Sequence, residues 1–119
     1  MNSDPDKTRN WIPNTNMFIS KNGDLIIKIE LGGLLTEDLV VKVENKSLRI
    51  KGVRHDSEMS DSRQILVRDV PAGPFECVME IPVGFDLSAS NSAYLKGMLR
   101  ITVPPKARPL GTPWSPRRN

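Results

Sequence analysis

The sequence holds few of the residues from which enzyme and metal sites are built. Its 119 residues include one histidine, one cysteine and only 5% aromatic residues. The single cysteine, Cys77, excludes an internal disulfide framework and is typical of a reducing compartment, so we expect a cytoplasmic protein. No apolar run approaches the roughly 18 residues that cross a bilayer, so we expect no membrane span.

The few reactive side chains form no recognisable constellation. His55 stands alone in a polar stretch, where a histidine is usually solvated. Cys77 falls on the apolar face of a predicted strand, where a cysteine behaves as a small hydrophobe. Asp56, Glu58 and Asp61 lack the regular ligand spacing of a calcium loop. The sequence therefore predicts no enzyme activity, no metal site and no cofactor.

The net charge of +3 is spread thinly along the chain. Lysines and arginines occur singly, except towards the end, where Arg117 and Arg118 are adjacent. A nucleic-acid binder usually has a concentrated basic stripe with aromatic residues for stacking. We therefore expect no nucleic-acid partner.

Apolar and polar residues alternate in five stretches, which predicts strands with one buried and one wet face. These stretches cover residues 24–31, 39–44, 47–53, 75–81 and 98–103. The pairs Asn22-Gly23 and Asn45-Lys46 suit tight turns, and residues 36–38 suit one short helical turn. The expected fold is all-β, an immunoglobulin-like sandwich of two antiparallel sheets with six to eight short strands.

Composition divides the chain into three parts. Residues 1–10 form a short polar N-terminal arm, residues 11–104 form the domain, and residues 105–119 form a proline-rich tail. Within the domain, residues 54–64 are polar and predict a long loop. Long loops in compact domains are usually functional or mobile.

Five short motifs follow one another in a specific order. They are Trp11-Ile12-Pro13, Leu31-Gly32-Gly33-Leu34, Leu48-Arg49-Ile50-Lys51-Gly52-Val53-Arg54, Gly73-Pro74-Phe75 and Gly97-Met98-Leu99-Arg100-Ile101-Thr102-Val103-Pro104. The ordered set resembles the small heat-shock proteins, the alpha-crystallin domain family of ATP-independent chaperones, and the bacterial type in particular. The resemblance covers roughly residues 11–105 and implies a protein that holds unfolding clients and suppresses their aggregation.

The resemblance also implies two binding features. The run Ile65, Leu66, Val67 and Arg68, carried by the long loop, would be a strand that exchanges into the sheet of a partner copy; the alternative is a loop that folds back on its own sheet. A groove for clients or tails would be lined by Leu39, Val41 and Val43 from one edge strand and by Ser90 and Ser92 from another.

Departures from the family pattern concern assembly. Family members carry an I-x-I motif in the tail that docks in this groove, and here the tail offers only Leu110-Gly111-Thr112. The N-terminal arm is short and polar, whereas the family's arm is longer and apolar. The serines also make the groove less apolar than usual. We therefore expect a homodimer or small homo-oligomer.

Two other functions stay open at this point. One is a co-chaperone or adaptor of the related CS-domain sandwich, which would bind one folded partner as a monomer. The other is a shell or coat component without chaperone activity, which the short arms disfavour. The exchanged-strand run and the glycine-led motif at 97–99 favour the holdase chaperone.

Overall fold

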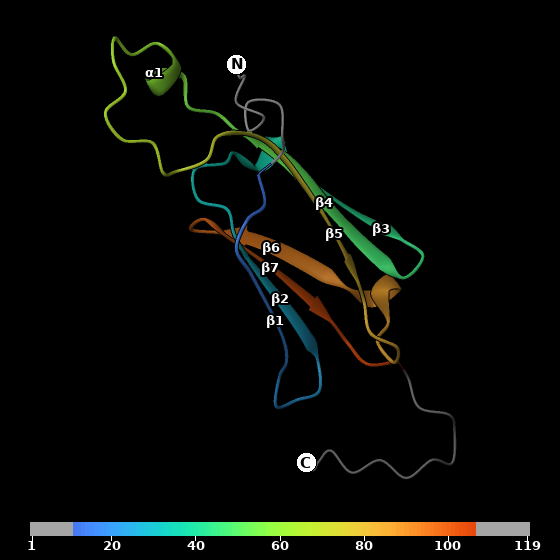
Figure 1. Ribbon diagram of the computed structural model, residues 1–119. Coiled ribbons are helices and arrows are strands. Elements are labelled where there is room, and N and C mark those ends of the chain that lie inside the picture. The colour runs from blue at the N-terminus through green and yellow to red at the C-terminus, as the bar shows by residue number, and fades with distance from the viewer. Residues whose placement is uncertain (1–10, 107–119) are drawn as a thin grey trace, which may run out of the picture.

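The computed structural model describes residues 11–106, which form two antiparallel sheets that face each other (Figure 1). The four-stranded sheet has the order β1-β2-β7-β6 and the three-stranded sheet the order β3-β4-β5. The strands are β1 (Thr15–Ile19), β2 (Leu25–Glu30), β3 (Leu39–Glu44), β4 (Ser47–Arg54), β5 (Gly73–Glu80), β6 (Asn91–Leu95) and β7 (Met98–Val103). The predicted all-β sandwich is confirmed.

The core lies between the two sheets, as the alternation predicts. In β2 and β7, Ile27 lies opposite Ile101 and both are buried. Leu48 and Ile50 of β4 and Phe75 of β5 fill the same space from the other sheet. Phe75 is 1% exposed and is the largest fully buried side chain of the domain. Burial of such side chains supplies most of the free energy that stabilises a fold of this kind.

Local turn chemistry follows the sequence. Gly23 and Asn45 have positive φ angles of 92° and 54° in the hairpins that join β1 to β2 and β3 to β4. Residues Thr36–Asp38 form the predicted short turn, a 3-10 helix labelled η2. A second one, η3 (Leu87–Ala89), precedes β6. Asp86 caps it by accepting a hydrogen bond from the backbone of Ser88.

Gly52 allows η2 to pack closely on β4. A β-carbon at this position would overlap the carbonyl oxygen of Asp38 and lie 3.0 Å from Cε2 of Phe75. The glycine is therefore required by a close approach of two backbones rather than by its own φ angle.

The outer face of the three-stranded sheet is charged. Arg49 in β4 pairs with Glu44 of β3 at 3.1 Å and with Glu76 of β5. Hydrogen bonds to Glu76 and then to Glu44 raise the pKa of Arg49 above its already high usual value. One arginine thus bridges all three strands across the solvent-facing side.

The long loop projects from one end of the sandwich (Figure 1). It connects β4 to β5 through residues 55–72, so Arg54 belongs to the strand and not to the loop. The loop contains a short helix, α1 (Ser57–Ser60), where we expected only irregular structure. Asp56 caps it by accepting a hydrogen bond of 3.1 Å from the backbone N–H of Met59. We call residues 55–72 the exchange loop, after the strand exchange that the sequence predicts for the run at 65–68.

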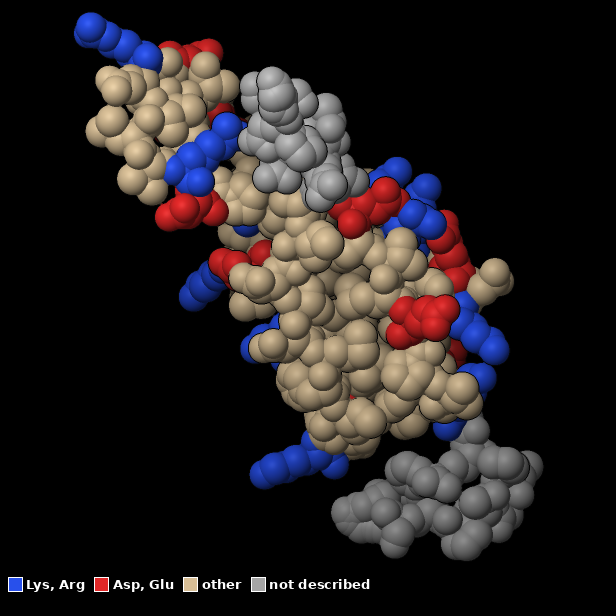
Figure 2. All heavy atoms as spheres, viewed as in Figure 1, with Lys and Arg blue, Asp and Glu red and all other residues tan. Residues whose placement is uncertain are grey.

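Charge is distributed without a dominant patch on the face drawn in Figure 2. Uncharged side chains cover the centre of the sandwich there, and basic and acidic side chains lie along its margins. No helix among residues 11–106 is long and apolar enough to cross a membrane.

Candidate functional site

The unpaired backbone edges of strands β3 and β6 lie on the same side of the sandwich. Tyr94 of β6 lies with its hydroxyl oxygen 2.5 Å from the carbonyl oxygen of Leu31 and 3.2 Å from that of Leu34. Leu34 lies just before η2, which leads directly into β3. Within residues 11–106, β3 pairs only with β4 and β6 only with β7, so each has one backbone edge free. We give the name edge groove to the residues at these two edges that the sequence predicts as its lining: Leu39, Val41 and Val43 on β3, and Ser90 and Ser92 at β6.

The β3 wall of the edge groove is apolar and only partly open. Leu39, Val41 and Val43 share the face that points towards the core, as the alternation predicts. Leu39 and Val41 already pack against the core cluster. Val43 is 50% exposed and is the most accessible aliphatic side chain of the wall.

The β6 wall combines serines with one aromatic residue. Ser92 lies opposite buried Ile101, and Tyr94 lies opposite buried Leu99, so both side chains point to the inner face. Ser90 precedes the strand and donates its backbone N–H to the carbonyl of Leu87. Our sequence-based list omitted Tyr94, although its spacing of two residues from Ser92 indicates the same face.

The opposite side of the sandwich is open as well. All five residues of β1 are exposed, among them Met17 at 40%, Phe18 at 45% and Ile19 at 61%. Strand β1 pairs only with β2 in the described part of the chain, so its outer backbone edge is free. Trp11, shortly before β1, forms a parallel bridge with Phe75 of β5, which places the β1 edge on the β5 side.

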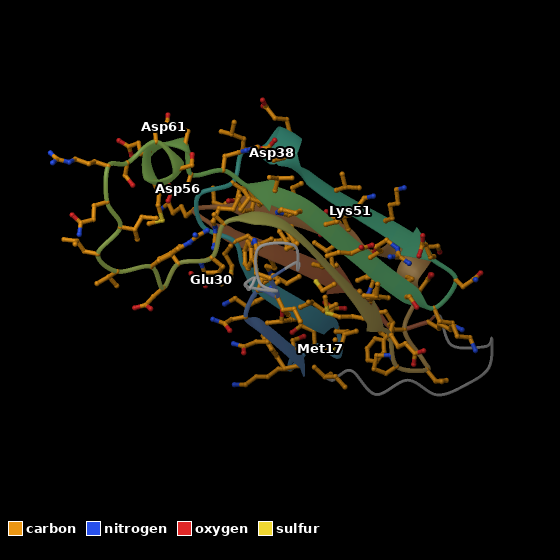
Figure 3. All side chains as sticks on the ribbon, turned by 45° about the horizontal axis from the view of Figure 1, so that its top comes forward. Met17, Glu30, Asp38, Lys51, Asp56 and Asp61 are labelled. Carbon is orange, nitrogen blue, oxygen red and sulfur yellow. The ribbon has the colours of Figure 1, made fainter. Side chains whose placement is uncertain are left out.

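The predicted exchanged run lies in the exchange loop and belongs to neither sheet of its own chain. Ile65, Leu66 and Val67 are 46%, 82% and 72% exposed, and Arg68 is exposed too. In Figure 3, Asp56 and Asp61 mark the loop beyond the end of the sandwich, whereas Met17 marks β1 on its edge. Three neighbouring aliphatic side chains thus lie in solvent on a loop that does not fold back on its own sheet.

The reactive side chains do not meet. His55 lies 3.7 Å from a carboxylate oxygen of Asp38 and is largely exposed. Cys77 is a free, half-buried thiol, and burial together with the charge of Glu76 raises its pKa. Among residues 11–106, no three histidine, cysteine or carboxylate side chains come close enough to hold a metal ion. The predicted tail residues Leu110 and Thr112, and the arm at 1–10, lie outside the described residues.

The fold is an all-β domain of two stacked antiparallel sheets, with a long loop between β4 and β5. The sequence profile of the Hsp20/alpha crystallin family matches residues 18–113. The chain belongs to this family. It is 26% identical over 98 residues to small heat shock protein C2 of Rickettsia felis, a match that covers 82% of this chain and 63% of the relative. The chain thus spans less than two thirds of that relative's length.

Solved structures share the fold. A small heat-shock protein from Xylella fastidiosa superposes with a TM-score of 0.78 at 20% identity, covering 90% of this chain and 97% of the other. HspA of Xanthomonas axonopodis gives a TM-score of 0.73 at 19% identity, with 82% and 97% covered. Heat shock protein 16.0 of Schizosaccharomyces pombe gives 0.71 at 20% identity, with 87% and 80% covered. The sandwich is therefore that of small heat-shock proteins from bacteria and a yeast.

Proposed function

We propose that this protein is an ATP-independent holdase chaperone that binds unfolding polypeptides and keeps them from aggregating. Membership of the Hsp20/alpha crystallin family supports a chaperone role. The observation that carries the proposal is the edge groove, where aliphatic side chains of β3 stand beside free backbone edges. Free strand edges and apolar grooves accept extended segments of other chains, through main-chain hydrogen bonds and side-chain burial.

The exposures in the edge groove set the expected strength of client binding. Full burial of an aliphatic side chain contributes about 1.5–3 kcal/mol. Val43, at 50% exposure, can still contribute a large part of this free energy when a client covers it. Leu39 and Val41 can contribute less, because they already pack on the core. Association and ordering costs offset much of the remainder. Weak, reversible binding of many clients follows, and such binding needs no nucleotide.

A matched pair of variants tests the groove. Val43 and Val78 lie on edge strands with exposures of 50% and 49%, but Val78 points to the charged outer face beside Arg49. Val43→Asp should lower the suppression of citrate synthase aggregation on heating at equimolar ratio, because a buried client segment would then meet a charge. Val78→Asp should leave suppression unchanged. A wild-type protein that does not slow the aggregation refutes the holdase proposal.

The proposed assembly is a homodimer in which each chain gives its run at 65–68 to the β1 edge of the other. The exposed aliphatic side chains of both segments support this pairing, since each would cover the other. The backbone edge of β1 offers hydrogen-bonding groups that an added strand would pair. Exchange of a short element between identical chains is a common route to dimers.

Sedimentation velocity tests the dimer. Leu66→Asp places a charge in the proposed interface and should halve the sedimenting mass. Val83→Asp is the control, because Val83 is 91% exposed but lies after β5, away from the exchange loop. A wild-type monomer at every concentration would refute the dimer and favour an adaptor that binds one folded partner.

We also propose that the protein works in the cytoplasm and carries out no chemical step. The single free thiol supports the compartment, and membership of a chaperone family supports a function without a chemical step. Fractionation of cells that produce the tagged full chain tests the compartment, and recovery outside the cytoplasmic fraction would contradict it.

A further inference from the structure

Arg54 closes the base of the exchange loop. It is the last residue of β4, immediately before the loop begins. Its Nη1 donates a hydrogen bond of 2.9 Å to the carbonyl of Pro71, close to the point where the loop returns to β5. Its Nε donates another of 2.9 Å to the carbonyl of Gly32, in the turn after β2. One guanidinium thus holds both ends of the loop against the body of the sandwich.

Trp11 lies over the same guanidinium. The Cζ atom of Arg54 is 4.2 Å from the centroid of the indole ring, a cation–π contact. The indole Nε1 donates a hydrogen bond of 3.0 Å to the carbonyl of Gly73, the first residue of β5. The ring also packs on Phe75, with centroids 5.0 Å apart and an interplanar angle of 49°. Because Phe75 is buried, this arrangement is anchored in the core.

Within one chain, these contacts connect the loop that carries the proposed donor run with the segment that leads into β1, the proposed acceptor. Trp11 lies four residues before β1, the proposed acceptor, and Asn14 between them accepts a hydrogen bond of 3.0 Å from the backbone of Glu30. Arg54 and Pro71 hold the loop that carries the proposed donor run. We call Arg54, Trp11 and the carbonyls of Gly32, Pro71 and Gly73 the clasp.

We propose that the clasp couples donor to acceptor and makes the strand exchange reciprocal, with Arg54 as the positioning residue. The inference rests on the proposed homodimer. The clasp is already formed within one chain, so it holds the segment that leads into β1 and the base of the exchange loop in one fixed relation. A partner's run that pairs with β1 therefore docks beside a loop whose direction Arg54 has already set. The second exchange then requires less ordering than the first.

The fork of the arginine side chain is essential to this coupling. A guanidinium presents several N–H groups in one plane, so it can bond two carbonyls while its face stacks on an indole. Lysine carries the same charge but lacks the planar fork, so Arg54→Lys should keep the fold and lose the coupling. Coupling between sites typically changes affinity about 5- to 150-fold. We expect the dimer dissociation constant of Arg54→Lys and Arg54→Ala to rise within that range.

Sedimentation equilibrium of the full-length chain tests the clasp. The control is Arg49→Ala, which removes the other arginine of β4, on the outer face and away from the clasp. Each variant is also unfolded in urea at a concentration below its dissociation constant, where the monomer is the starting state, so that dimer affinity and fold stability are measured separately. Arg54→Lys should raise the dimer dissociation constant, while its urea midpoint should equal that of Arg49→Ala.

A second readout follows the indole itself. In a Trp114→Phe background, Trp11 is the only tryptophan. Its emission should change as the protein is diluted through its dissociation constant, and in Arg54→Lys this change should move to the higher protein concentration at which that variant dissociates. Equal dissociation constants for Arg54→Lys and Arg49→Ala overturn the clasp proposal, as does a Trp11 signal that never responds to dilution of a wild-type dimer. A wild-type chain that is always monomeric overturns the homodimer itself.

Discussion

Tyr94 and Leu31 are 63 residues apart in sequence, yet the tyrosine hydroxyl lies 2.5 Å from the leucine carbonyl oxygen. Leu31 is fully buried, and its own N–H donates to the carbonyl of Gly97 at 2.7 Å. The single hydroxyl proton of Tyr94 is shared with the carbonyl of Leu34 at 3.2 Å. This side chain therefore connects β6, one wall of the edge groove, to the segment that leads into the other wall.

Removal of that hydroxyl should destabilise the fold. Tyr94→Phe leaves a buried carbonyl without its partner, which costs about 1–3 kcal/mol. Urea denaturation should show a lower midpoint with an unchanged slope, because the surface exposed on unfolding stays the same. Ser92→Ala on the same face of β6 is the control and should have little effect, since Ser92 is exposed. An unchanged midpoint for Tyr94→Phe would show that the hydrogen bond contributes nothing.

Gly52→Ala should destabilise the domain through steric overlap with the carbonyl of Asp38. Overpacking of a tight site costs about 1–3 kcal/mol, and here the obstructing atom belongs to the backbone. Gly32→Ala is the matched control, because a β-carbon there meets nothing within 4 Å and its φ angle is not positive. Thermal unfolding followed by circular dichroism compares the two, and equal melting temperatures would refute the close approach.

Cys77 should make stability depend on alkaline pH. Its pKa is raised in the folded state, first by burial and then by the charge of Glu76. Above the ordinary thiol pKa of about 8.5, the unfolded chain loses the proton while the folded chain keeps it, so stability falls as pH rises. Below that pH, the thiol adds no pH dependence in either state.

Comparison with Cys77→Ala isolates this effect, because the two proteins differ only at this side chain. The free energy of unfolding of the wild type should fall more steeply between neutral and alkaline pH than that of the variant. Parallel curves would contradict the raised pKa. The thiol of the folded wild type should also react with iodoacetamide more slowly than that of the urea-unfolded chain.

Removal of the tail should leave the assembly unchanged, because its Leu110-Gly111-Thr112 is a poor match to an I-x-I motif. The truncation should begin at residue 107. Pro105 forms a bridge with Phe85, and Lys106 donates its backbone N–H to the carbonyl of Gly84 at 2.9 Å, so an earlier cut would damage the domain. Light scattering of the full and truncated chains measures the effect, and a loss of mass would show that the tail assembles the protein.

Most strands of the sandwich could be predicted from the sequence, because a strand with one buried face has alternating apolar and polar residues. Ile27, Ile101 and Leu48 lie where that alternation places them. The helix α1 was missed, although Asp56 three residues before Met59 is a capping signal. A helix of four residues is too short to show a period.

The clasp could not be predicted in the same way. Trp11 and Arg54 are distant in sequence, and no local sequence pattern predicts that they are in contact. Their contact depends on how the turn after β2 meets the start of β5, which only the folded chain determines. Likewise, the alternation of β3 identified the inward face of Val43 but not that half of its surface stays open at the sheet edge.

The bridge made by Arg49 has a consequence for solubility. A protein with several open sheet edges risks pairing with its own copies into fibres, and charged side chains on edge strands oppose this. Arg49 holds Glu44 on β3 and Glu76 on β5, so both edges of the three-stranded sheet carry fixed charge on their solvent side. This fixed charge opposes the pairing of either edge with the same edge of another copy.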